Sequence, residues 1–382
     1  MDSQIIALEL MKIYGSSTSS LVRRLESPPK RLYARVNTLR VTREEVLESL
    51  LREGVEAHPD DSISDAVYFE VQGPFKFECN ASKAIVVDKK TAVSLMLGAN
   101  LYRPGVIKIT SFERGELLLA VTENYIPVAC LEAALTHKEA MSLRKGLIGV
   151  NMGSPYRAPR IAETKAYISG LIYSQSAPSI LTSYALDPRK DELVVDMNAA
   201  PGGKTGHVVQ LTSGRARVVA VDRNERKIET LTTTLLHLGL YLNVLPLSMD
   251  SRYIHLDLSL HEKADKVLID PPCSNLGVRP LLGAKRKLSS VTNLAKYQRQ
   301  FLKAAWHVLK PGRRLVYSTC TLTLSEDEEN IAYAVEDLGF SVVELESPLP
   351  YSDKVSYRGI TAYRFSPLLA DMPGYFIAVL TK

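Results

Sequence analysis

The sequence predicts an α/β fold in three segments: a small α/β unit over residues 1–77, a small β-barrel or sandwich over residues 78–154, and a doubly wound, mostly parallel sheet over residues 155–382. The last segment alternates strands with helices, which is typical of a parallel sheet covered on both faces. The middle segment has short strands at a spacing of roughly 8–12 residues, as in small β domains. A length of 382 residues fits two or three domains.

The first segment reads as helix, strand, helix and strand. The first helix and the two strands are expected at residues 4–14, 31–39 and 66–71. The second helix lies in TREEVLESLLREG, where Thr42 is the expected N-cap, Glu45 follows three residues later and Gly54 is the expected C-cap. This order predicts a small α/β unit.

The middle segment begins with a helical stretch and continues as β-structure. KKTAVSLMLGA is the expected helix, and strands follow in LYRPGVIKIT, ERGELLLAVT and YIPVACLEA. Gly and Pro between these strands favour turns. GVNMGSPYRAP, with two Gly and two Pro, is the predicted boundary to the last segment.

The last segment supplies the predicted doubly wound sheet. Seven strands are expected at residues 192–197, 216–222, 242–250, 263–270, 312–319, 340–346 and 375–381. Helices are expected at residues 204–212, 225–239, 291–309 and 325–339. Ligands of such folds bind at the carboxyl ends of the strands, so the residues there are the site candidates.

Composition and cysteine usage narrow the class of protein. A hydrophobic content of 46% excludes a disordered chain, and a formal charge of +5 is compatible with nucleic-acid binding without establishing it. No apolar run reaches the roughly 18 residues of a membrane span, and MDSQIIALEL does not read as a signal peptide. We therefore expect a cytoplasmic protein with no metal site, in which all four cysteines are free thiols: Cys79, Cys130, Cys273 and Cys320.

The first strand of the last segment runs into DMNAAPGGKTG, residues 196–206. Glycines between a strand and a helix let the backbone approach a ligand closely. The dinucleotide motif GxGxxG is absent, and the loop lacks the first Gly of GxxxxGK[ST], so neither a dinucleotide nor a nucleoside triphosphate is indicated.

Acidic residues end four successive strands, namely Asp196, Asp222, Asp250 and Asp270. Asp222 follows Gly203 at about the 20-residue spacing of an acid that accepts from a ribose hydroxyl. Asp250 could accept from an adenine amino group. S-adenosylmethionine needs such acceptors and a close-approach turn but no phosphate cradle, and it is the predicted cofactor.

Two cysteines end neighbouring strands beside this site, Cys273 in VLIDPPCSNL and Cys320 in RRLVYSTC. Carbon 5 of a pyrimidine becomes nucleophilic only after a group adds to carbon 6, and a thiolate is well suited to that addition. Two thiols beside a methyl donor therefore predict carbon-5 methylation, with Asp270 favouring cytosine. An aromatic residue in place of Cys273 would suit methylation of an amino nitrogen. The residues alone leave either thiol as the nucleophile, and DNA cytosine methylases use the one in the proline motif.

At these residues the sequence resembles the Sun-type RNA (cytosine-5) methyltransferases of the NOL/NOP/Sun family. DMNAAPGGKT resembles the family's cofactor loop, DPPCS its first cysteine motif and STCTLTLSEDEEN its second. RVNTLR resembles its N-terminal RNA-side motif and RFSPLLADMPGYFIAVL its closing segment. The resemblance implies a Rossmann-like class I methyltransferase domain over residues 155–382.

Residues 78–154 resemble a PUA domain, an RNA-binding barrel, in KAIVVDKKTAVSLMLGANLYRPGVIK and RKGLIGVNMGSPYRAP. Together with CSNLGVRP after DPP, this arrangement is similar to the subgroup that modifies tRNA near its acceptor end. The resemblance implies methylation of cytosine 72 of tRNA, engagement of the CCA end by the PUA domain, and a monomeric enzyme.

The resemblance also assigns roles to residues. Cys320 would be the nucleophile and Cys273 would help to release the product, while Asp270 and Lys204 would contact the base. The cofactor site would be lined by Asn198, Ala199, Ala200, Pro201, Gly202, Gly203, Lys204, Asp222, Lys227, Asp250 and Asp270. The sequence departs from the family's common Cys, Arg, Trp and Phe at Asn198, Lys227, Ser366 and Tyr375.

Basic residues of the middle segment are candidate RNA contacts: Lys89, Lys90, Arg103, Arg144 and Lys145. If they bind phosphates, RNA affinity should fall steeply with salt. Two alternatives stay open at this point. One is a ribosomal RNA cytosine-5 methyltransferase, and the other is an RNA-binding assembly factor without activity.

Overall fold

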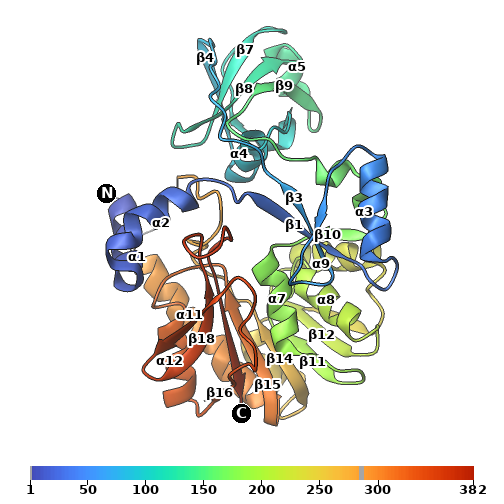
Figure 1. Cartoon of the computed structure of the whole chain (residues 1–382), viewed down its shortest axis with the longest axis vertical. Coiled ribbons are helices and arrows are strands. Elements are labelled where there is room, and N and C mark those ends of the chain that lie inside the picture. Colours follow the sequence, from blue (N-terminus) through green and yellow to red (C-terminus); the bar gives the residue numbers. More distant parts are fainter. Residues whose placement is uncertain (1, 284–287) are drawn as a thin grey trace. The chain divides into compact units, whose positions relative to one another are not determined.

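The computed structural model describes residues 2–283 and 288–382 (Figure 1). These residues form two compact units. The first unit combines the residues up to Tyr68 with Ile161–Arg279 and with the chain from residue 288 onward, and the second unit contains Phe69–Arg160 and residues 280–283. No helix in the described part of the chain is long and apolar enough to cross a membrane.

The first unit begins with helices and a four-stranded sheet. Its elements are α1 (Asp2–Tyr14), η1 (Gly15–Ser17), α2 (Thr18–Leu25), β1 (Arg31–Val36), α3 (Arg43–Arg52), β2 (His58–Pro59), β3 (Ala66–Glu70), η3 (Ile161–Glu163), α6 (Lys165–Ile168) and β10 (Ile172–Ser174). The strand order is β10-β1-β3-β2, so the sheet includes two strands that the sequence did not predict, β10 and β2. The predicted capping box of α3 is confirmed: Thr42 and Glu45 each accept from the other's backbone N–H.

The large sheet of the first unit has nine strands. They are β11 (Leu193–Asp196), β12 (Arg217–Asp222), β13 (Val244–Ser248), β14 (Ala264–Ile269), β15 (Leu309–Thr319), β16 (Ser341–Val342), β17 (Asp353–Tyr357), β18 (Ile360–Phe365) and β19 (Tyr375–Thr381). The order is β13-β12-β11-β14-β15-β19-β18-β17, with β16 also paired to β19. The first five strands are parallel and the others antiparallel. The predicted count of seven strands is wrong, because the β17–β18 hairpin extends the sheet.

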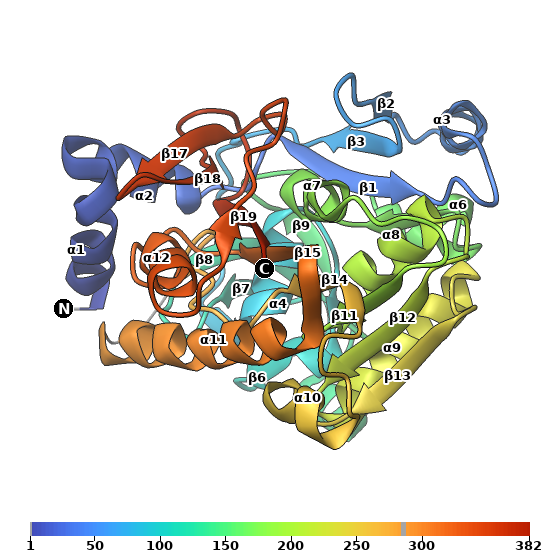
Figure 2. The same cartoon turned by 90° about the horizontal axis from the view of Figure 1, so that it is seen from below.

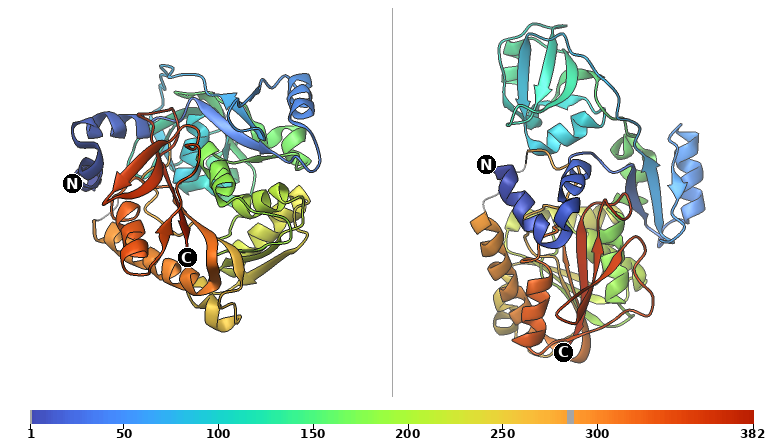
Figure 3. Two further views of the ribbon diagram at one scale, coloured as in Figure 1. Left: turned by 60° about the horizontal axis from the view of Figure 1, so that its bottom comes forward. Right: turned by 60° about the vertical axis from the view of Figure 1, so that its left-hand side comes forward.

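Helices cover both faces of this sheet, as a doubly wound fold requires (Figure 2). They are α7 (Ala177–Leu186), α8 (Gly203–Leu211) and α9 (Glu225–Leu238) on one face, and η4 (Ser251–Tyr253), α10 (Ile254–Asp257), α11 (Leu288–Val308) and α12 (Glu328–Glu336) toward the other. Neighbouring residues of one strand divide between the two cores, Val194 in the first and Val195 in the second. Figure 3 shows α11 and α12 side by side in orange.

The N-terminal sheet packs on the same core as α7 and α8. Tyr33, Ile63 and Ala66 belong to this buried cluster. Arg35, which is 1% exposed, donates from Nη1 to the Gln175 side chain at 2.7 Å and to the Gly203 carbonyl at 2.6 Å. This contact fixes β1 against the loop that begins α8.

The second unit is a six-stranded sheet with two helices. Its elements are β4 (Lys83–Val87), α4 (Lys89–Met96), β5 (Leu101–Tyr102), η2 (Arg103–Gly105), β6 (Val106–Lys108), β7 (Leu117–Val121), β8 (Pro127–Ala133), α5 (His137–Ser142) and β9 (Leu147–Gly153). The strand order is β5-β9-β8-β7-β4-β6. The short strands expected from the Gly and Pro spacing are confirmed, while closure into a barrel stays a prediction.

The expectation of four free thiols is wrong for one pair. Cys79, in the loop before β4, and Cys130, in β8, form a disulfide with Cα atoms 5.3 Å apart. The two residues are 51 positions apart, and nothing in the sequence shows that the loop returns to β8. Cys273 and Cys320 are free thiols.

Candidate active site

The carboxyl ends of the parallel strands meet at one cavity of about 390 Å³. Its walls include the strand-end acids Asp222, Asp250 and Asp270, and both free cysteines, Cys273 and Cys320. The predicted gathering of acids and thiols at one edge of the sheet is therefore present.

The loop between β11 and α8 forms another wall. Asn198 and Ala200 line the 390 Å³ cavity, while Ala199, Pro201, Gly203 and Lys204 line an adjoining hollow of about 180 Å³. Gly202 lines neither, but it has a φ of +105°, a conformation that side chains disfavour.

A side chain at position 203 would force a neighbour to move. A Cβ there would lie 2.8 Å from Cε1 of the Tyr173 ring, so glycine permits the close packing of this loop against β10. The small residues of this loop thus serve packing and ligand approach together.

The strand-end acids differ in their partners. Asp222 pairs with Lys227 Nζ at 3.2 Å, and Asp250 receives the guanidinium of Arg252, whose hydrogen bonds lower the pKa of the Asp250 carboxyl. Burial raises the pKa of Asp196 to about 6, although Thr205 donates to it at 2.7 Å. Asp222 and Asp250 face the cavity, and Asp196 supports the loop from behind.

The two thiols lie against each other. The Cys273 and Cys320 Sγ atoms are 3.3 Å apart, and Asn275 Oδ1 accepts from Cys320 Sγ at 3.0 Å and from Cys273 Sγ at 3.3 Å. Cys273 is buried, whereas Cys320 is half-buried. The hydrogen bond to Cys320, burial, and the charges of Cys320 and Glu326 raise the pKa of the Cys273 thiol well above its ordinary value. Cys320 is thus the more accessible thiol of the pair.

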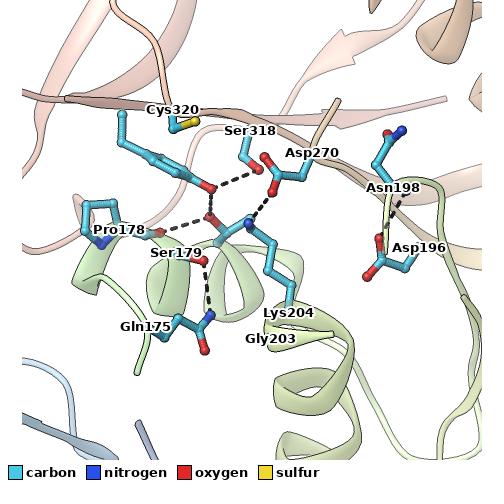
Figure 4. Close-up of polar contacts among 12 residues, drawn as sticks. Gln175, Pro178, Ser179, Asp196, Asn198, Gly203, Lys204, Asp270, Ser318 and Cys320 are labelled. Carbon is cyan, nitrogen blue, oxygen red and sulfur yellow. Dashed lines mark hydrogen bonds and ion pairs between the residues drawn. The ribbon is translucent and has the colours of Figure 1, made fainter. Parts of the chain in front are cut away.

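Lys204 and Asp270 form an ion pair beside the thiols, with Nζ and Oδ2 2.5 Å apart (Figure 4). Burial alone lowers the pKa of Lys204, but the Asp270 carboxylate and the Tyr375 hydroxyl outweigh it and raise that pKa. The Tyr375 hydroxyl lies 3.3 Å from Ser318 Oγ, two residues before Cys320. The lysine is therefore held as a cation at the edge of the site.

A buried carboxylate joins the two cysteine segments. Glu326, 0% exposed, accepts from the Ser274 backbone N–H at 2.8 Å, from Ser274 Oγ at 2.5 Å and from Thr323 Oγ1 at 2.9 Å. Ser274 follows Cys273, and its hydroxyl also lies 2.7 Å from Thr321 Oγ1, which follows Cys320. Since each cysteine is followed by a residue of this network, Glu326 fixes the spacing of the thiols.

A second, more apolar cavity of about 380 Å³ lies on the other side of Cys320. Residues of β1, including Arg31 and Tyr33, line it together with Arg279 and Tyr375. Cys320 lines both cavities, so its thiol stands where two bound molecules could meet.

The five predicted RNA contacts lie on neighbouring segments of the second unit: Lys89 and Lys90 at the start of α4, Arg103 in η2, and Arg144 and Lys145 before β9. The Asp88 backbone N–H donates to the Gly105 carbonyl, and the Arg103 backbone N–H donates to the Gly146 carbonyl. Lys89, Lys90, Arg144 and Lys145 are exposed, whereas Arg103 is half-buried and donates to the Ala140 carbonyl. Four of the five side chains thus lie at the surface of the unit.

Sequence reasoning missed three residues of the site, namely Arg252, Asn275 and Glu326. Asn275 and Glu326 lie within quoted motifs, but neither spacing nor periodicity assigned them contacts. Glu326 belongs to the acidic run SEDEEN, which reads as an exposed helix start, yet the structure buries it. Arg252 follows a strand-end acid and reads as a surface charge.

Comparison with known proteins adds to this geometry. Residues 183–381 match the family described as 16S rRNA methyltransferase RsmB/F, and residues 6–76 match the RsmF/B-like ferredoxin-like domain. The first match spans the large sheet and both cysteine motifs.

Individual relatives match over almost the whole chain. The tRNA (cytosine(72)-C(5))-methyltransferase of Pyrococcus horikoshii is 34% identical over 97% of this chain and 94% of its own. The mouse tRNA (cytosine(72)-C(5))-methyltransferase NSUN6 is 29% identical over 91% of this chain and 80% of its own. The crystal structure of NSun6 from Pyrococcus horikoshii with SFG, an analogue of S-adenosylmethionine, superposes with a TM-score of 0.90 at 32% identity, covering 99% of this chain and 97% of that one.

Proposed function

The chain belongs to the RsmB/F family of methyltransferases, and from this premise we propose that it methylates carbon 5 of cytosine 72 in the acceptor stem of tRNA. The resemblance predicted from the cofactor loop and the cysteine motifs is confirmed at the level of the family, as is dependence on S-adenosylmethionine. The single observation that carries the proposal is the position of Cys320, which lies 3.3 Å from a second thiol and lines two cavities.

The residues of the larger cavity fit S-adenosylmethionine. Asp222 and Asp250 present carboxylates for ribose and adenine, and Asn198 Oδ1 is buried without a hydrogen-bond partner among the described residues. When bound, the cofactor supplies an electrophilic methyl group. The residues that would hold it are Asn198, Ala199, Ala200, Pro201, Gly202, Gly203, Lys204, Asp222, Lys227, Asp250 and Asp270.

The thiols divide the chemistry. Cys320, as thiolate, would bond carbon 6 of the cytosine and so make carbon 5 nucleophilic. Cys273 would assist after methylation by relaying the proton from carbon 5 to water, while the bond between sulfur and carbon 6 breaks and Cys320 returns as thiolate. The greater accessibility of Cys320 supports this division, and the raised pKa of Cys273 keeps that thiol protonated while its neighbour attacks.

Asp270 and Lys204 would hold the base during this sequence. Asp270 can accept from the amino group of cytosine or share a proton with the ring nitrogen. Lys204 keeps the carboxylate oriented through the 2.5 Å contact. The base would enter through the apolar cavity beside Tyr375 and the N-terminal sheet.

The proposed division of labour follows the predicted boundaries. Residues 155–382 would be the methyltransferase domain, residues 78–154 a PUA domain that binds the CCA end, and residues 1–77 an RNA-side unit. Lys89, Lys90, Arg103, Arg144 and Lys145 would contribute to tRNA binding. We also propose that the enzyme acts as a monomer in the cytoplasm; light scattering and cell fractionation would check these two points.

Bisulfite sequencing tests the function directly. The protein would be incubated with S-adenosylmethionine and with unmodified transcripts of tRNA and of small-subunit ribosomal RNA, with Cys320→Ala as the inactive control. We expect a new 5-methylcytosine at tRNA position 72 and none in a transcript with uridine there. Methylation confined to ribosomal RNA would favour the activity in the family's description and overturn the tRNA proposal.

A further inference from the structure

Asn275 contacts the sulfur atoms of both free cysteines, Cys273 and Cys320. It follows Cys273 by two residues, after β14, and lines the larger cavity. Its Oδ1 accepts from both thiols, and the two sulfurs and this oxygen form a triangle with sides of 3.0, 3.3 and 3.3 Å. One amide group therefore sits where the attacking and the releasing thiol meet.

The backbone on both sides fixes this amide. The preceding Ser274 is held by Glu326 through its N–H and its hydroxyl, and the Gly277 N–H donates to the Cys320 carbonyl at 3.0 Å. Asn275 itself has a φ of +58°, a left-handed conformation that Asn and Gly adopt far more readily than other residues. The side chain is thus aimed at the thiols by the fold of its own turn.

An amide is suited to this place because it both accepts and donates. Its oxygen receives the S–H of a thiol, and its N–H₂ can be presented to a thiolate after rotation of the side chain. Accepting from Cys320 turns the S–H toward Asn275 and leaves the sulfur lone pairs free to face a bound base. The same contact keeps Cys273 beside the carbon that it must serve next.

We propose that Asn275 is a further catalytic residue, which orients the Cys320 thiol for attack on carbon 6 and holds Cys273 beside it for product release. This inference rests on the function proposed above. A glycine retains the left-handed turn and removes only the amide, so Asn275→Gly isolates the contact without threatening the fold.

Steady-state kinetics with tRNA test the role. We expect Asn275→Gly to lower kcat by at least about tenfold, because the thiols lose their shared anchor, while the KM for tRNA and the Kd for S-adenosylmethionine stay within about twofold. The matched control is Asn243→Gly, which makes the same change at a φ of +60° in an exposed turn where Asn243 donates to Gly214. A kcat within twofold of wild type, or an equal loss in the control, would overturn the proposal.

A second measurement needs no RNA. Asn275→Asp places a carboxylate against both sulfurs and disfavours thiolate, so alkylation of Cys320 by iodoacetamide should reach half its maximal rate about one pH unit higher than in wild type. The titratable groups around the thiols are unchanged in every variant: Lys204, Asp270, Tyr317, Glu326 and Tyr375.

The two measurements separate the possible failures. An unmoved alkylation profile in Asn275→Asp would overturn the role of Asn275 whatever RNA is methylated. A wild-type protein that methylates no RNA, with the alkylation profile shifted as expected, would overturn the proposed function and leave the contact between the amide and the thiols supported.

Discussion

In each of the two cysteine pairs of this chain the two sulfur atoms lie close together, but the pairs differ in chemistry. In the second unit Cys79 and Cys130 are joined covalently, across a loop and a strand of one sheet. In the first unit Cys273 and Cys320 lie 3.3 Å apart and remain thiols. Proximity is common to both pairs, so the surroundings must decide what each pair does.

The two pairs differ in the polar groups that lie around their sulfur atoms. The free pair shares the amide of Asn275, is spaced by the buried Glu326 and has the Lys204–Asp270 ion pair beside it. In the disulfide, by contrast, the Cys130 side of the bond is buried, with 4% of that residue exposed. One pair is thus arranged to change protonation state, and the other to tie two segments together.

The largest expected effect is on the thiol proposed to attack. Cys320→Ala should lower methylation by about 10³-fold or more and abolish the covalent adduct, because it removes the thiolate proposed to add to carbon 6. A gel shift under denaturing conditions, with RNA carrying a cytosine analogue blocked at carbon 5, measures the adduct. An adduct that persists in Cys320→Ala and disappears in Cys273→Ala would reverse the assignment.

Cys273→Ala should slow a different step of the reaction from the one that Cys320→Ala abolishes. We expect attack to survive and turnover to fall by about 10²-fold, so that the denaturant-stable adduct accumulates on unmodified tRNA during turnover. A time course of adduct and of methylated product measures both steps in one sample. If the adduct decays at the wild-type rate, Cys273 has no part in release.

Loss of the disulfide should lower the free energy of unfolding without changing the rate of methylation. A cross-link between residues 51 positions apart is worth about 2–4 kcal/mol of unfolding free energy, so Cys79→Ser/Cys130→Ser should unfold at a lower temperature. Calorimetry with and without reductant tests this: reductant should lower the melting temperature of wild type and of the control Cys273→Ser, which both keep the disulfide, and should leave that of the double variant unchanged. Equal melting temperatures for the double variant and wild type would remove the distinction between the pairs.

The smallest effect is a dependence on pH that only the free pair can show. Folded Cys273 keeps its proton where an unfolded thiol, with a pKa of about 8.5, has lost it, so the folded state binds more protons there. Stability should therefore fall as pH rises above about 8.5, by at most about 1.4 kcal/mol per pH unit, and Cys273→Ser should lack this slope. Urea titrations of both proteins between pH 8 and pH 10 would measure the difference, and parallel slopes would contradict it.

Much of the fold was open to prediction because local patterns carry it. The capping box of α3, the alternation of strands and helices, and the acids at strand ends depend on spacings of a few residues, and each is present. The family resemblance then predicted a separate role for each free cysteine, whereas the chemistry of the residues alone had left the two roles interchangeable.

The rest depends on contacts between distant residues. β10 is a three-residue strand that exists because β1 offers it an edge, and the disulfide depends on a loop returning to β8. Glu326 and Asn275 look like surface residues in the sequence, and their roles arise only where two strand ends meet. Such pairings have no signature in a single sequence.

The pairing of β1 with β10 also has a consequence for biosynthesis. Residues 34–36 must remain without this partner until residues 172–174 have left the ribosome, since these supply the other side of the ladder. Nearly all of the second unit is made during that interval. The chain therefore completes its first sheet only after synthesising its insertion, so we expect the protein to assemble from the middle outward rather than from its amino terminus.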